Sequence, residues 1–176
     1  MLFRSASADD FAAAVHGARA VVVVGGDGTV RSIARTMVGR PEPLAILPTG
    51  TENLAAREYG FHGLRMQRLV AAVAAGSSRR VDLGIVRRPG GQHAIFTVMA
   101  SVGFDADVVA RVDELRRGPI ARTAYLGPIL RLAHGWRPPE VVAEGPGAEG
   151  GRVRCVGTVV VANARQYAVR LDRSEE

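Results

Sequence analysis

The chain has 176 residues and a formal net charge of +6, from 23 basic and 17 acidic side chains. Every basic residue is an arginine, so a Walker A loop, a protein-kinase strand lysine and a Schiff-base lysine are all excluded. The positive balance favours anionic partners, and one cysteine, Cys155, cannot form an intrachain disulfide. No stretch reads as a signal peptide or a membrane span, which predicts a cytoplasmic protein.

The predicted fold is organised around a strand, a glycine-rich turn and a helix. Residues 20–24 are apolar and include four consecutive valines, which is typical of a parallel strand buried on both faces. Gly25, Gly26 and Gly28 then allow positive φ angles and let a ligand approach the backbone. The apolar spacing after them predicts a helix over 30–38, and the N-terminus of such a helix favours a phosphate group.

Asp27 lies inside this turn and makes it more specific than a plain glycine cluster. A carboxylate beside a polyphosphate is repulsive unless a divalent cation or a proton-acceptor role accounts for it. We interpret Asp27 as part of a Mg²⁺ network or as a proton acceptor. The alternative is an ordinary tight turn in which Asp27 caps the helix.

A second strand and turn follow the first. Residues 44–47 predict a short apolar strand, the polar segment 48–53 predicts a turn, and residues 54–58 predict the start of a helix. The carboxyl ends of parallel strands meet at one edge of a sheet, where open α/β sheets bind ligands. The two turns together therefore predict a nucleotide-binding crevice.

The remaining elements follow from the apolar periodicity and the Gly and Pro signals. We place a domain boundary after residue 78, where the pattern changes from helices to strands. Asp82 follows this linker on the alternate face of a predicted strand, and it either points into the crevice or is simply exposed. The expected helices cover residues 7–18, 66–73, 107–117 and 120–134, and the expected strands cover 81–85, 94–102, 141–144 and 153–162.

Arginines are concentrated in the two helical segments between residues 107 and 134. A basic and partly amphipathic helical layer could lie on anionic lipid. The alternative is a solvated arginine face over an ordinary core. The residues concerned are Arg111, Arg116, Arg117, Arg122 and Arg131.

Five ordered motifs resemble those of the diacylglycerol kinase-like lipid kinases, a family related to NAD kinases and phosphofructokinases. The first motif alone would not separate these relatives, whereas the second is similar to the lipid-kinase loop and differs from the NAD kinase sequence. The matching segments are Gly25-Gly26-Asp27-Gly28-Thr29, Leu47-Pro48-Thr49-Gly50-Thr51-Glu52-Asn53, Val81-Asp82-Leu83-Gly84, Ser101-Val102-Gly103-Phe104-Asp105-Ala106 and Val160-Val161-Ala162-Asn163.

This resemblance implies an α/β fold with a Rossmann-like nucleotide-binding domain over residues 1–78. It further implies an antiparallel β-sandwich domain with inserted helices over residues 79–176, and phosphorylation of a lipid hydroxyl by ATP in the cleft between the domains. Asp27 and Asp82 would hold Mg²⁺ through water. The residues expected at ATP are Gly25, Gly26, Asp27, Gly28, Thr29, Gly50, Thr51 and Asn53.

The chain also departs from the family pattern. The family has a strand and an Asn-Pro loop upstream of residue 1 and an acidic catalytic-base segment downstream of Asn163, and Leu54 stands where many members have an acid. We therefore expect an incomplete chain with little or no kinase activity and an exposed strand edge that promotes self-association. We assign no general base. Asp27 is a possible base in the first glycine loop, and Asp172 is a carboxylate in a segment that does not match the family sequence.

Two alternative functions stay open from the sequence. One is a related kinase that acts on a soluble hydroxyl substrate such as NAD, and the other is a non-catalytic module that binds nucleotide or anionic lipid. The expected ligands are ATP, Mg²⁺ and, for the leading lipid-kinase function, a lipid at a membrane surface. Nucleic acid is not an expected partner, and peripheral attachment to a membrane is compatible with a cytoplasmic location.

Overall fold

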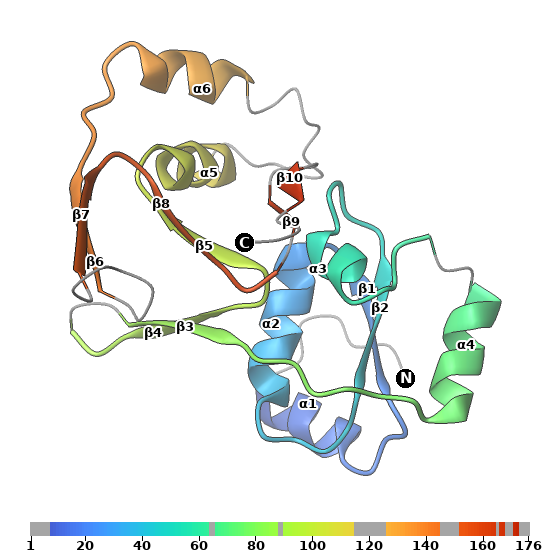
Figure 1. Ribbon diagram of the computed structural model, residues 1–176. Coiled ribbons are helices and arrows are strands. Elements are labelled where there is room, and N and C mark those ends of the chain that lie inside the picture. Colours follow the sequence, from blue (N-terminus) through green and yellow to red (C-terminus); the bar gives the residue numbers. More distant parts are fainter. Residues whose placement is uncertain are drawn as a thin grey trace. The chain divides into compact units, whose positions relative to one another are not determined.

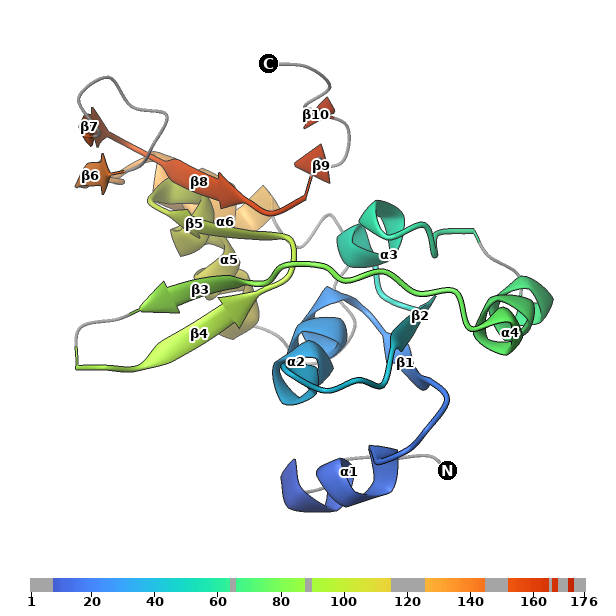
Figure 2. The same cartoon turned by 60° about the horizontal axis from the view of Figure 1, so that its bottom comes forward.

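The computed structural model describes residues 8–63, 66–87, 90–114, 126–144, 152–164, 166–167 and 171–172. The chain divides into two compact units, which are considered separately (Figures 1 and 2). The first comprises Met1–Val98 together with Asn163–Glu176, and the second comprises Met99–Ala162.

The first unit contains a parallel strand pair, as the sequence predicts. In β1 and β2, Val21 lies opposite Leu44 and Gly25 lies opposite Pro48, so both strands end at the same edge. A hairpin of β3 and β4 and a short antiparallel pair of β9 and β10 complete the unit. Its elements are α1 (Ala8–Val15), β1 (Val21–Gly25), α2 (Asp27–Met37), β2 (Leu44–Pro48), α3 (Leu54–Glu58), α4 (Met66–Ala75), β3 (Gly84–Arg87), β4 (His93–Phe96), β9 (Gln166–Tyr167) and β10 (Leu171–Asp172).

The core of this unit lies between the parallel strands and α2. Val23 and Ile46 from the strands and Val30 from α2 are almost completely buried. The expectation that β1 is buried on both faces is wrong for the described residues, because Val22 and Val24 are 46% and 51% exposed. Alternate side chains of a strand point to opposite faces, so α2 covers one face of β1 and Val22 and Val24 stay exposed on the other.

The helices that follow β2 form where the sequence predicts them. In Figure 1, α2 and α4 lie on opposite sides of the β1–β2 pair, and α4 contacts β2. Leu69 anchors α4 and is only 2% exposed. The helix ends before Gly76, whose φ of +68° is the left-handed conformation that glycine provides after a helix.

The predicted hairpin exists, but its second strand is shorter than expected. Val86 of β3 lies opposite Ala94 of β4, and the apolar run over 94–102 is interrupted at Thr97. The hairpin belongs to the first unit because β4 contacts α2. The compact unit therefore continues beyond residue 78, where we predicted a boundary, and the assignment of domains to functions stays a prediction.

The second unit consists of two antiparallel strand pairs and two helices. Strand β5 pairs with β8, and β6 pairs with β7. Figure 1 shows α5 between α6 and the β5–β8 pair, and α5 contacts both β5 and α6. Its elements are β5 (Met99–Val102), α5 (Phe104–Glu114), α6 (Leu126–Ala133), β6 (Glu140–Glu144), β7 (Arg152–Val156) and β8 (Val159–Ala162).

Several boundaries in this unit differ from the predicted ones. The expected strand over 153–162 is two strands, because Gly157 adopts a φ of +133° that breaks the extended run. Helix α5 begins at Phe104, before the expected start, and Val109 is 48% exposed although we predicted that it points inward. Gly127 and Pro128 lie in the first turn of α6, where proline is tolerated, and do not interrupt a longer described helix.

The overall class is therefore a mixed α/β fold of small sheets and helices, as expected. The described residues do not establish the Rossmann-like and β-sandwich arrangements, which stay predictions. Among the helices that the structure describes, none is both long enough and apolar enough to cross a bilayer.

Candidate functional site

The two predicted loops lie against each other at the carboxyl ends of β1 and β2. The backbone N–H of Thr49 in the second loop donates to the carbonyl oxygen of Gly25 in the first, at 3.1 Å. A Cβ placed on Gly26 would lie 3.1 Å from the Cα of Gly50. The structure therefore brings together the loops that the sequence analysis predicted to share one edge.

The glycines at this edge are required for a reason that differs from the predicted one. Gly25, Gly26 and Gly28 do not adopt positive φ angles. A Cβ on Gly25 would lie 2.6 Å from the Cβ of Thr29, and a Cβ on Gly50 would lie 2.6 Å from the Cα of Gly26. Gly25, Gly26 and Gly50 thus allow close packing, whereas nothing lies within 4 Å of a Cβ on Gly28.

Asp27 joins the two loops through its side chain. It is the first residue of α2, and its Oδ1 accepts a hydrogen bond from the backbone N–H of Ala55 at 2.8 Å. Ala55 lies in the first turn of α3 and is fully buried, so its N–H needs a partner within the protein. Asp27 therefore begins α2 and also stabilises the start of the neighbouring helix α3.

Asn53 shapes the second loop. Its backbone is in the left-handed region, with φ 52° and ψ 46°, a conformation that Asn tolerates better than most residues. Its Oδ1 accepts from the N–H of Gly50 at 2.8 Å, and its Nδ2 donates to the carbonyl oxygen of Gly50 at 2.6 Å. The Asn53 amide thus closes the turn, and Thr51 lies exposed within that turn.

The N-terminus of α2 opens at the place where the loops meet. Its N-cap residue is Gly26, and no side chain caps this end of the helix. The first intrahelical bond runs from the N–H of Val30 to the carbonyl oxygen of Gly26. The amides of the first helical turn have no intrahelical acceptor, and Gly28 and Thr29 are exposed. This end of an 11-residue helix therefore carries donors and a partial positive charge that suit an anion.

Asp82 lies in the segment between α4 and β3, and not on a strand as expected. Its side chain is exposed, and its carbonyl oxygen accepts a hydrogen bond from Nδ2 of Asn163 at 2.7 Å. In the described part of the chain, the hydrogen bonds of Asp27 and Asp82 join them to Ala55 and Asn163, and not to each other. Across the described ranges, no group of three or more His, Cys, Asp or Glu side chains is arranged to hold a metal ion.

Asn163 has a structural role that the sequence analysis missed. Besides Asp82, its Nδ2 reaches the carbonyl oxygen of buried Thr97 at 3.1 Å, and its backbone N–H donates to Val98 at 2.7 Å. The hydroxyl of Tyr59 donates to the same Thr97 oxygen at 3.1 Å. A single asparagine after a valine-rich strand was the only signal in the sequence, and it does not identify partners that lie far away along the chain.

Tyr59 extends this network toward solvent. Burial of the phenol raises the pKa of Tyr59, the neighbouring carboxylate of Glu58 raises it further, and Arg79 opposes both effects. The Arg79 guanidinium lies 5.7 Å from the centre of the Tyr59 ring. The network fixes the segment that carries Asp82 to the strand ends of the same unit.

The structure gives little information on the possible base Asp172 and on the arginines between residues 107 and 134. Asp172 lies in β10 opposite Gln166, and its side chain is outside the described part of the chain. Arg116, Arg117 and Arg122 lie outside the described residues as well. Arg111 and Arg131 are described and are exposed on α5 and α6.

Comparisons with known proteins agree with the motifs. Residues 3–86 match the model of the diacylglycerol kinase catalytic domain. A diacylglycerol kinase of Mycobacterium tuberculosis H37Rv is 35% identical over 114 residues, which are 65% of this chain and 37% of that protein. A probable YegS-like lipid kinase of Pseudomonas aeruginosa PAO1 is 37% identical over 109 residues, covering 60% of this chain and 33% of the relative.

A probable YegS-like lipid kinase of Pseudomonas fluorescens Pf-5 gives a similar result, with 36% identity over 112 residues. That match covers 60% of this chain and 34% of the relative. The chain thus spans about a third of the length of the curated relatives that it matches. The matched segment contains both glycine loops, and residues 3–86 are therefore similar to the diacylglycerol kinase catalytic domain, as the order of motifs predicts.

Proposed function

We propose that the chain belongs to an ATP-dependent lipid kinase and binds the phosphates of ATP at the N-terminus of α2. The observation that carries this proposal is the uncapped helix start at Gly26, which lies where the two glycine loops touch. The match of residues 3–86 to the diacylglycerol kinase catalytic domain supports the reaction class. The reaction would move the γ-phosphate of ATP to a lipid hydroxyl.

Backbone amides supply the phosphate-binding groups in this proposal. The chain has no lysine, so no P-loop-type lysine is available for the phosphates. The amides of Gly28 and Thr29 lie in the exposed first turn of α2, and a Cβ on Gly28 would meet open space. A phosphate can therefore approach the helix start without displacing protein atoms.

Asp27 is the residue best placed to assist a magnesium ion. One of its oxygens is bound to Ala55, which fixes the carboxylate beside the helix start. Mg²⁺ at nucleotide sites keeps several waters and uses one or two protein carboxylates together with the phosphates, so a full protein cage is not required. We propose Asp27 and Asp82 as these carboxylates. Bound Mg²⁺ would neutralise charge on the phosphates.

The proposed lipid substrate follows from the family alone. The relatives of this chain are named diacylglycerol kinase and probable lipid kinase, and the chain covers about a third of their length. We propose a lipid hydroxyl as acceptor and assign no general base. Contact with anionic lipid is a separate proposal.

Calorimetric titration with Mg-ATP tests the nucleotide site. Asp27→Asn keeps an oxygen that can accept from Ala55 but removes the charge, so we expect a loss in binding free energy on the order of 1–3 kcal/mol. Glu140→Gln removes one acidic charge from an exposed side chain in the other unit and should bind like wild type. Equal affinity of wild type and Asp27→Asn would remove Asp27 from the site.

Transfer is tested with radiolabelled ATP and mixed micelles that contain diacylglycerol. The departures from the family pattern predict a low rate of labelled phospholipid formation, and any lipid-dependent label should be lost in Asp27→Asn. Mg-ATP binding without labelled lipid would instead favour a nucleotide-binding module, and labelling of NAD in place of lipid would favour a kinase for a soluble hydroxyl.

A further inference from the structure

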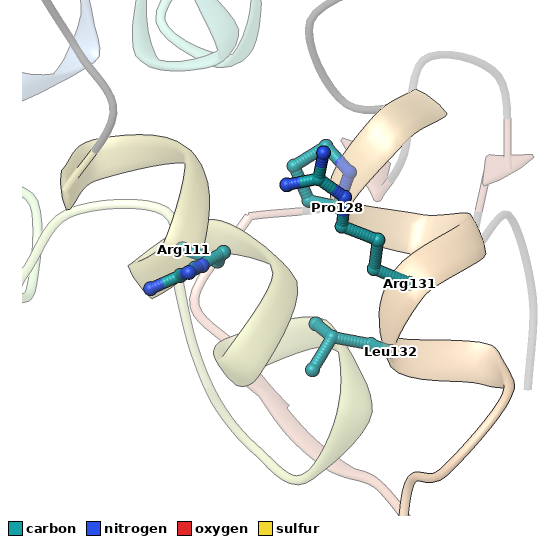
Figure 3. Close-up of a pocket in the computed structure, with 4 residues that line it drawn as sticks. All are labelled: Arg111, Pro128, Arg131 and Leu132. Carbon is teal, nitrogen blue, oxygen red and sulfur yellow. The ribbon is translucent and has the colours of Figure 1, made fainter.

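The second unit contains a basic cavity between its two helices. A cavity of about 370 Å³ is lined by Arg111 from α5 and by Pro128, Arg131 and Leu132 from α6 (Figure 3). Its charged lining is entirely arginine. Arg111 also forms an ion pair with Glu114 at 2.6 Å, whereas Arg131 has no ion-pair partner among the described residues. The cavity thus offers guanidinium groups beside apolar surface.

The exposed side of α6 is apolar, and this feature is independent of the cavity. Leu126, Ile129 and Leu130 are 59%, 36% and 71% exposed. The spacing of these residues, i, i+3 and i+4, places them on one face of the helix. Val109 on α5 adds a further exposed apolar side chain, at 48%. A single exposed apolar side chain would need no explanation, but three of them on one face of an eight-residue helix form an apolar stripe.

We propose that α6 docks on the surface of an anionic phospholipid membrane. Leu126, Ile129 and Leu130 enter the boundary between head groups and acyl chains, and Arg131, together with Arg111, binds the lipid phosphates. Charge complementarity selects this occupant. Guanidinium groups suit phosphates in a planar fork, whereas the leucines need an apolar phase that a soluble polyanion does not provide.

The short helix sets the expected strength of this contact. An eight-residue helix is about 12 Å long and can insert only one apolar stripe, so attachment is weak and reversible. Each arginine near an anionic surface contributes about a fivefold factor in affinity, and this contribution decreases as salt screens it. The biological meaning of the contact rests on the proposed lipid-kinase function, because it would supply the lipid-facing surface of that enzyme.

The test is co-sedimentation of the full 176-residue chain with vesicles and without nucleotide. Vesicles of phosphatidylcholine are compared with vesicles in which about a third of the lipid is phosphatidylglycerol, a fraction that gives a negative surface potential. We expect binding to the anionic vesicles that weakens with salt. Leu130→Ser and Arg131→Gln should each reduce binding about fivefold or more.

Two matched variants serve as controls within the same unit. Val156 is 70% exposed on β7, so Val156→Ser removes as exposed an apolar side chain as Leu130→Ser does. Arg154→Gln removes one positive charge from β7, where Arg154 pairs with Glu140 at 3.0 Å. Both controls should bind like wild type.

Folding of each variant is checked by the fluorescence of Trp136, the only tryptophan in the sequence. Its ring packs edge-to-face on Phe104 at 5.2 Å, and its Nε1 donates to Asp107 at 2.8 Å, so its emission reports on this unit. Unchanged emission with reduced binding supports the proposal.

Equal binding to neutral and anionic vesicles would overturn the proposal. So would equal losses in the α6 variants and the β7 controls, or a self-association that Leu130→Ser abolishes while no vesicle binding occurs. The vesicle test contains no ATP, so a failed kinase assay leaves its outcome unchanged, and a failed vesicle test leaves the nucleotide site unaffected.

Discussion

Gly50→Ala tests the loop contact on which the proposed nucleotide site depends. The added methyl group would lie 2.6 Å from the Cα of Gly26 and 2.9 Å from Oδ1 of Asn53. The first neighbour is backbone and cannot rotate away. The two loops must therefore separate by several tenths of an ångström, which would also strain the 2.8 Å bond between Asp27 and Ala55.

Overpacking of this kind costs about 1–3 kcal/mol in the free energy of unfolding. Gly28→Ala is the matched control, because it adds the same methyl group two residues after Gly26, in open space and with no positive φ to strain. Alanine also favours a helix over glycine, so this control should be unchanged or more stable by about 0.5 kcal/mol. Gly50→Ala should therefore lower the free energy of unfolding, whereas Gly28→Ala should leave it unchanged or raise it.

Urea unfolding, followed by far-ultraviolet circular dichroism, measures both effects. Gly50→Ala should lower the midpoint without changing the slope, and amide hydrogen exchange should locate the faster exchange in residues 44–58. A wild-type midpoint for Gly50→Ala, or an equal loss in Gly28→Ala, would show that the loops do not depend on this close contact.

Other predictions concern the network around Thr97 and the carboxylate of Glu42. Asn163→Ala should lower the free energy of unfolding by about 1–3 kcal/mol, and Tyr59→Phe by about 0.5–1.5 kcal/mol. Because both side chains donate to the Thr97 carbonyl, their effects in a double-mutant cycle measured in urea should not add, and strict additivity would contradict the shared acceptor. The Gly17 N–H, 3.0 Å from Oε1 of buried Glu42, holds the pKa of Glu42 below its ordinary value of 4.5. This group therefore stabilises the fold above that value and loses its contribution as pH falls through the lowered pKa. In thermal unfolding, the stability of Glu42→Gln should fall less steeply than that of wild type as the pH is lowered below 4.5, and parallel curves would exclude this role.

The local parts of the fold could be predicted because their signals are local. Four consecutive valines followed by glycines and a helical apolar spacing predict β1 and α2, and a similar pattern predicts β2 and α3. Parallel pairing then places both loops at one edge without any knowledge of side-chain contacts. This reasoning placed the loops that carry Asp27 and Gly50 at one edge of the sheet, where the structure has them.

The contacts between distant segments could not be predicted in the same way. The need for glycine at residues 26 and 50 arises from the approach of two loops, and a glycine in a single sequence cannot distinguish close packing from a positive φ. The Asn163 side chain meets a carbonyl 81 positions away, which no periodicity encodes. An apolar run such as 153–162 likewise contains no information on which strand each half will pair with.

The central claim is that phosphates bind the first turn of α2. The most direct measurement is an NMR titration of the uniformly labelled chain with Mg-ATP, in which backbone amide shifts are followed residue by residue. The account predicts that the largest shifts occur at Gly28 and Thr29, with smaller ones in residues 49–53 across the loop contact, and that Asp27→Asn weakens all of them together. Saturable shifts confined to α6, or no shift at Gly28 and Thr29 at saturating nucleotide, would contradict it.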